Sequence, residues 1–202
     1  QFCQQVPTYH GEKAFTSGPV YVGAIICFLF VLGLLIVQGP YKWALLIATL
    51  FSITLAWGRN MMWFTELFFN YFPMYSKFRA VESILVVAEI TIPLLAILAL
   101  QKIVDRKVEW KKLRTSMFIA GGLTAGLSLF FALFGGIVDI TSSYDSQWTS
   151  QVPAWLKDAI LEQRTAMIKA DAWRSFIFIA LGFAIVYWYA WQTQKAQQPK
   201  HN

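Results

Sequence analysis

Long apolar segments, separated by short polar ones, dominate this chain. The predominantly apolar segments are 19–37, 43–57, 81–101, 115–138 and 175–191. Only 81–101 carries charged residues, Glu82 and Glu89. About 20 residues of α-helix cross the hydrocarbon core of a bilayer. The pattern therefore predicts an all-α fold, a polytopic transmembrane helical bundle of about five spans, in a single domain over 1–202.

Two further segments predict helices that do not span. The apolar part of 58–80 is interrupted by Glu66, Asn70 and Pro73, which favours an interfacial or re-entrant helix. In 139–173, apolar residues recur at helical spacing, at Val152, Trp155, Leu156, Ala159, Ile160, Met167 and Ala170. This spacing predicts an amphipathic helix lying on the membrane or on the rest of the protein, with Glu162 and Arg164 on its solvated face.

The composition agrees with a membrane protein. Hydrophobic residues make up 57% of the chain and charged residues 14%, against roughly 25% charged residues in soluble domains. The net charge of +6 could indicate nucleic acid. However, the densest basic cluster is one short loop between apolar segments, so the expected partner is membrane lipid and not nucleic acid. Cys3 and Cys27 predict neither a disulfide nor a metal pattern.

The basic loop also predicts the orientation. Residues 102–114 contain six basic and two acidic residues, and short loops rich in Lys and Arg stay in the cytoplasm. Alternation then places 38–42 and the C-terminus inside. The N-terminal segment 1–18 and the segments 58–80 and 139–173 are expected outside. Close packing of the span 115–138 is predicted from its small residues Gly121, Gly122, Ala125 and Gly126.

The polar residues between Trp57 and Pro93 are the main functional candidates. Arg79, Glu82, Glu89 and Pro93 share one helix face by their spacing. Glu89 would lie roughly 10 Å deeper than Glu82. A charged face at that depth is expected to look into the bundle or into a wet cavity.

Two interpretations of this cluster stay open. Arg79 and Lys77, with Arg59, could bind a phosphate at the outer membrane surface, because Arg offers a bidentate fork and Lys a point charge. Alternatively, Arg79 pairs with Glu82 for structural reasons, and Glu89 is a buried, hydrogen-bonded or protonated group. His10 could act with Glu12 as an acid–base pair, although a single loop histidine is more often only solvated. No nucleotide-binding loop, nucleophile elbow or HExxH motif occurs.

The stretch WGRNMMWFTELFFNYFPMYSKFRAVESILVVAEITIPLLAILAL, with PTYHGEKAFTSGPVYVGAI before it, resembles the YfhO family of bacterial membrane proteins. The resemblance is closest to versions from Bacteroidetes and runs from about Pro7 to the last apolar segment. FPMYSKFR is its more specific part. The family is similar to the GT-C class of integral membrane glycosyltransferases. The resemblance therefore implies sugar transfer from a polyprenyl-phosphate-linked donor to an unknown acceptor, at the outer face of the cytoplasmic membrane.

The resemblance also implies what this chain lacks. GT-C enzymes carry the catalytic carboxylate in the first outside loop, and this chain starts after that point, so we expect a piece of a longer protein. No catalytic residue and no cofactor is assigned. A divalent metal in the full-length protein stays an open alternative. Lys77, Arg79 and Arg59 are the expected donor-phosphate residues, supported by Glu82, Glu89, Asn70, Tyr75 and His10.

Two other functions compete with this one. The chain could belong to a transporter or flippase for an anionic lipid or polymer, with Glu89 and Pro93 lining the pathway. It could also be a non-catalytic membrane subunit.

Overall fold

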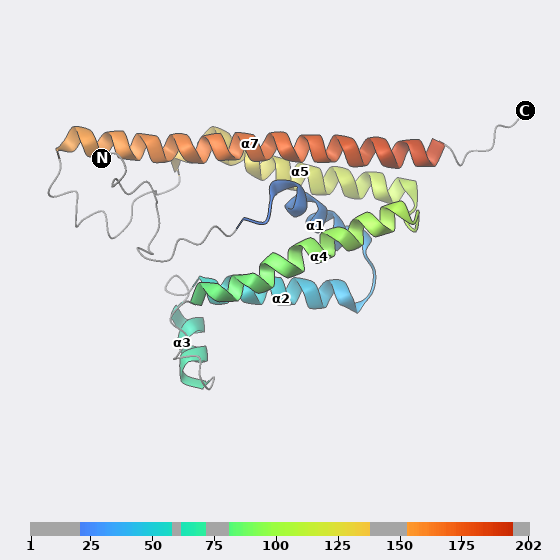
Figure 1. Ribbon diagram of the computed structural model, residues 1–202, viewed down its shortest axis with the longest axis horizontal. Helices are drawn as coiled ribbons and strands as arrows, with labels where there is room; N and C mark the ends of the chain where they lie inside the picture. Colours follow the sequence, from blue (N-terminus) through green and yellow to red (C-terminus); the bar gives the residue numbers. More distant parts are fainter. Residues whose placement is uncertain (1–20, 58–61, 72–80, 138–152, 196–202) are drawn as a thin grey trace, which may run out of the picture.

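The computed structural model describes residues 21–57, 62–71, 81–137 and 153–195. In these ranges all regular structure is helical (Figure 1). The elements are α1 (Ala24–Ile36), α2 (Pro40–Ala56), α3 (Met62–Tyr71), η4 (Val81–Ile84), α4 (Leu85–Val104), α5 (Trp110–Phe134), η5 (Gly135–Ile137) and α7 (Ala154–Lys195). The predicted all-α class is thereby confirmed for the described part of the chain.

Three helical stretches are long and apolar enough to cross a membrane, namely Leu85–Val104, Trp110–Ile137 and Trp155–Thr193. The helices α1 and α2 have 13 and 17 residues. At about 1.5 Å per residue they reach roughly 20 and 25 Å, less than a hydrocarbon core of about 30 Å. The membrane class is supported by these lengths, and the count of about five spans stays a prediction.

The helix α7 corrects one predicted boundary. The sequence suggested an amphipathic helix in 139–173 and a separate span at 175–191, but one helix of 42 residues runs through both. The chain has neither Gly nor Pro between Ala154 and Leu181, and the polar residues there are mostly good helix formers. Near Arg174 the sequence changes from mixed to apolar, but the helical backbone continues without a break.

The core lies where α1, α4, α5 and α7 meet. Phe28, Leu32, Leu95 and Met117 are completely buried there. Gly33 of α1 allows the closest approach, because a Cβ at this position would lie 2.9 Å from the carbonyl oxygen of Leu95. Small residues at a helix crossing bring two backbones together and increase dispersion contacts.

The small residues of α5 divide into two groups. Gly121 is packed, since a Cβ there would lie 2.9 Å from the Phe183 ring of α7, and Ala125 packs against the core. Gly122 and Gly126 instead face open space. The predicted packing role is confirmed for Gly121 and Ala125 and wrong for the other two. The four positions were grouped by composition, whereas helix phase separates those that face α7 from those that do not.

The connections of the bundle gather at two opposite ends. Figure 1 shows the link from α1 to α2, the turn from α4 to α5 and the last turn of α7 at one end, which we call the basic end. The described residues next to 58–61, 72–80 and 138–152 lie towards the opposite end, which we call the polar end. The alternation predicted from the sequence, with 38–42, 102–114 and the end of the last helix on one side, agrees with this arrangement. Which side of a membrane each end faces stays a prediction.

Candidate functional site

Most of the predicted phosphate site lies outside the described residues. This holds for Lys77, Arg79, Arg59, Tyr75 and His10. Glu82 belongs to η4, but its side chain is not among those described. The elements around this stretch, the end of α2 and the start of η4, pack against each other at the polar end (Figure 1).

The short helix α3 carries the next predicted residue, Asn70. Asn70 is exposed, and so are Trp63, Leu67 and Tyr71 on the same helix. The ring of Phe68 meets Phe51 of α2 at 5.5 Å between centroids, which anchors α3 to the bundle. A short helix was expected here, and its exposed Trp and Tyr are of the kind found at membrane interfaces. Its interfacial or re-entrant position stays a prediction.

Glu89 does not point into the packed core of the bundle, and the wet cavity that the sequence also allowed stays a prediction. Glu89 is exposed, beside the exposed apolar side chains Val86 and Ile90. The face that packs against α1 and α2 instead carries Ala88 and Leu95. The packed face of α4 therefore holds small and aliphatic residues, and Glu89 lies outside it. Pro93 is half-buried within α4.

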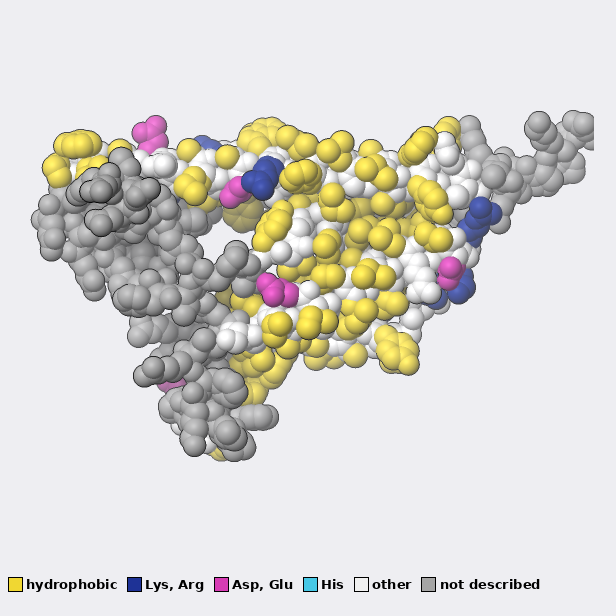
Figure 2. Space-filling model, viewed as in Figure 1, with side chains coloured by type: hydrophobic (Ala, Val, Ile, Leu, Met, Phe, Trp, Pro, Cys, Tyr) yellow, Lys and Arg dark blue, Asp and Glu magenta, His cyan; other side chains and the backbone are white. Residues whose placement is uncertain are grey.

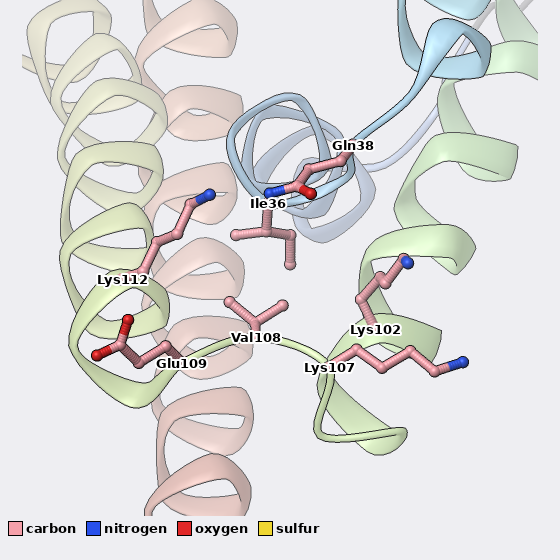
Figure 3. Close-up of a pocket in the computed structure, with 7 residues that line it drawn as sticks. All are labelled: Ile36, Gln38, Lys102, Lys107, Val108, Glu109 and Lys112. Carbon is pink, nitrogen blue, oxygen red and sulfur yellow. The ribbon is translucent and has the colours of Figure 1, made fainter.

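A cavity of about 300 Å³ opens at the basic end (Figure 3). The residues that line it come from the end of α1, the end of α4 and the start of α5: Ile36, Gln38, Lys102, Lys107, Val108, Glu109 and Lys112. Ile36 and Val108 are nearly buried, at 3% and 8% exposure. A second hollow continues from Glu109 and Lys112 to Thr115 and Ser116. In the sequence, the charge of this loop predicts the topology and does not by itself indicate a cavity.

The turn between α4 and α5 positions these lysines. The backbone N–H of Lys107 donates to the carbonyl of Lys102 at 3.1 Å, and that of Arg106 donates to Ile103 at 3.1 Å. This is the hydrogen-bond pattern of a Schellman motif, which requires a left-handed residue after the helix. Arg106 takes that role with φ 56°. The chain therefore reverses sharply and keeps Lys107 close to the last turn of α4.

The charges of the basic end are unevenly paired. Lys107 forms an ion pair of 2.9 Å with Asp105. Within the described ranges, neither Lys102 nor Lys112 takes part in an ion pair or side-chain hydrogen bond. The helix α5 begins beside them, and its N-cap residue Glu109 makes no side-chain capping bond. The positive end of the helix dipole adds to the positive potential there.

Arg164 contradicts its predicted exposure. It was expected on a solvated face with Glu162, yet it is 1% exposed, the largest fully buried side chain among those described, while Glu162 is exposed. On the predicted apolar face, Ile160 is buried against the protein and Trp155 is 70% exposed. Ile160 and Arg164 are four residues apart and share the face that packs inward. The sequence signal for this burial is the helical spacing, which puts Arg164 on the same face as the apolar Ile160.

Comparison with protein-family models, with curated proteins and with solved structures finds no match. Within the described residues, no group of three or more His, Cys, Asp and Glu side chains could hold a metal ion. The fold and the two ends therefore define the class: an α-helical protein in which three helical stretches are long and apolar enough to cross a membrane, and in which one end of the bundle is lined by lysines.

Proposed function

We propose that this chain is part of an integral membrane glycosyltransferase-like protein, which uses a polyprenyl-phosphate-linked sugar at the outer face of the bacterial cytoplasmic membrane. The observation that carries the proposal is the separation of two polar regions. The lysine-rich turn lies at one end of the bundle, and the elements flanking 58–61 and 72–80 lie at the other.

The positive-inside rule gives this separation a direction. If the basic end faces the cytoplasm, the polar end faces outside. Lys77 and Arg79 would then stand at the level of lipid headgroups, where the phosphate of a polyprenyl-linked donor lies. Guanidinium and ammonium groups are suited to phosphate oxygens. The catalytic carboxylate would come from another part of a longer protein.

The outer face of α4 supports the lipid character of the donor. Val86, Ile90 and Leu94 are exposed along this face, which begins at η4. A polyprenyl chain needs continuous apolar surface next to the phosphate site, and these side chains supply it. In Figure 2 hydrophobic side chains cover most of the visible surface between the two ends.

Donor binding tests the proposal. The protein in proteoliposomes is titrated with a polyprenyl-phosphate sugar, comparing the wild type with Arg79→Ala and with the matched control Arg174→Ala, whose side chain is 69% exposed on α7. Loss of a charged phosphate contact is expected to weaken binding about tenfold, whereas the control keeps wild-type affinity. Equal affinity in all three would remove the assignment of Arg79.

A transporter or flippase is the second candidate, and Glu89 favours it. A carboxylate on the exposed face of a membrane helix is costly unless it serves transport or meets a partner. This candidate predicts that Glu89→Gln abolishes ion-coupled movement of an anionic lipid and that no glycosylated product forms. Unchanged function after joint neutralisation of Arg79 and Glu89 would favour a non-catalytic subunit instead.

A further inference from the structure

We propose that the cavity at the basic end binds the phosphate headgroup of an anionic phospholipid from the adjoining membrane leaflet. This site is distinct from the donor site at the polar end, and it does not depend on sugar transfer. It rests on three features: the placement of two lysines and a carboxamide, the charge left over after internal pairing, and the exposed aromatic residues at the same end of the bundle.

The first feature is geometric. In Figure 3, Lys102 and Lys112 stand on opposite sides of the cavity, and the Gln38 carboxamide lies between them. Ile36 and Val108 fill the space below the three polar groups. Two ammonium groups and one amide N–H₂ can together donate to several oxygens of one phosphate. Gln38 comes from the link between α1 and α2, Lys102 from α4 and Lys112 from α5, so the arrangement exists only in the folded bundle.

The second feature is the charge balance. Asp105 is engaged by Lys107 at 2.9 Å, and the ammonium of Lys42 donates to the Leu34 carbonyl at 3.2 Å. These two cations already have partners. Figure 3 shows the carboxylate of Glu109 directed away from Gln38 and Lys102. The charges of Lys102 and Lys112 therefore remain for a ligand, and that ligand is an anion.

The third feature identifies a lipid as the source of the phosphate. At the basic end Tyr41 is 75% exposed and Trp43 57% exposed, and such aromatic residues mark the interfacial level of a membrane protein. On α4, Leu100 and Val104 are also exposed, near the level of Lys102 but on another side of the helix. The cavity therefore opens at the depth of lipid headgroups, where a phospholipid presents its phosphate.

Native mass spectrometry of the whole chain in detergent tests the proposal, with phosphatidylglycerol as the probe and phosphatidylcholine as the zwitterionic comparison. The double variant Lys102→Gln, Lys112→Gln is expected to bind phosphatidylglycerol at least tenfold more weakly, since even one lost charge-assisted hydrogen bond to the phosphate weakens binding about tenfold. The matched control is Arg106→Gln, Arg114→Gln, which removes the same charge from the same loop but from residues that do not line the cavity. The control is expected to lose at most threefold.

Three results would overturn the inference. Equal losses in both double variants would mean general attraction between a basic loop and anionic lipid. Equal affinity for phosphatidylglycerol and phosphatidylcholine would mean that the headgroup charge is not recognised. Full competition by inorganic phosphate at lipid-equivalent concentration would mean a site for a soluble anion. The variant Lys102→Arg, Lys112→Arg keeps the charge and should retain binding, which separates a lost site from a misfolded protein; its failure to bind would also contradict the inference.

Discussion

The two ends of the bundle use basic residues in opposite ways. At the basic end, Lys102 and Lys112 surround an open cavity and have no partner among the described residues. Towards the polar end, Arg164 is completely enclosed, 1% exposed, where α7 passes η5. An exposed cation keeps its charge for a ligand, whereas an enclosed cation must be compensated inside the protein. Positive charge therefore serves recognition at one end and architecture at the other.

The largest effect is expected from Arg164→Ala. Removing this enclosed side chain leaves a large void, so the free energy of unfolding should fall by about 3 kcal/mol. Denaturant titration in detergent measures it. Arg174→Ala is the matched control, because Arg174 is exposed and forms only a 3.8 Å pair with Asp171; about 0.5 kcal/mol or less is expected there. Similar losses in both variants would show that burial does not distinguish the two arginines.

Gly33→Ala should have the next largest effect on stability, and it should also weaken lipid binding at the basic end. The added methyl group meets the Leu95 backbone and side chain at 2.9 Å, which should destabilise the fold by about 2 kcal/mol. Moving α1 also displaces Ile36 from the cavity floor, so phosphatidylglycerol binding should weaken as well. Thermal unfolding and lipid titration test both effects.

Gly122→Ala is the control for that substitution. Nothing lies within 4 Å of the new methyl group, and Ala is preferred over Gly inside a helix by about 1 kcal/mol. This variant should be as stable as the wild type or more so. If Gly33→Ala were equally harmless, the close approach of α1 and α4 would not contribute to stability.

These pairs show what the sequence could and could not predict. Apolar length predicted helices at α4, α5 and the second half of α7, because about 20 apolar residues have few alternatives to a buried helix. The charge of 102–114 and the alternation of spans predicted that Lys102 and Lys112 lie at the same end as 38–42. This could be predicted because a short turn holds the ends of both flanking helices together. The phase of each helix was harder: Arg164 was expected on a solvated face and is buried, and Glu89 was expected to look into the bundle or a wet cavity and lies outside the packed core. Phase depends on which neighbour packs most closely, and that is a tertiary property.

A smaller gain in stability is expected from Arg106→Gly. Arg106 holds the left-handed position of the turn at φ 56°, and this conformation costs a residue with a side chain at least about 1 kcal/mol relative to glycine. Arg106→Ala is the comparison, because it also removes the guanidinium but keeps the strain. The glycine variant should melt roughly 2–4 °C above the alanine variant. Equal melting temperatures would mean that the turn relaxes without the arginine.

The smallest effect should come from Thr91→Val. Thr91 takes part in a polar contact between α2 and α4. The hydroxyl groups of Thr91 and Thr49 lie 2.7 Å apart and are buried. Each can also donate to a carbonyl in its own helix, Thr91 to Val87 at 2.9 Å and Thr49 to Leu45 at 2.7 Å. Two hydroxyl protons cannot make all three bonds, so one bond always lacks a donor.

After Thr91→Val, the Thr49 hydroxyl still has the Leu45 carbonyl, and no buried donor is left without an acceptor. The loss should therefore be only about 0.6 kcal/mol, typical of hydrogen bonds between membrane helices. A double-mutant cycle with Thr49→Val measures the coupling between the two hydroxyl groups directly. A coupling above about 2 kcal/mol would exceed that range, and it would mean that the bond between α2 and α4, not the bonds within each helix, takes the protons. The polar end would then depend on this contact as well as on Arg164.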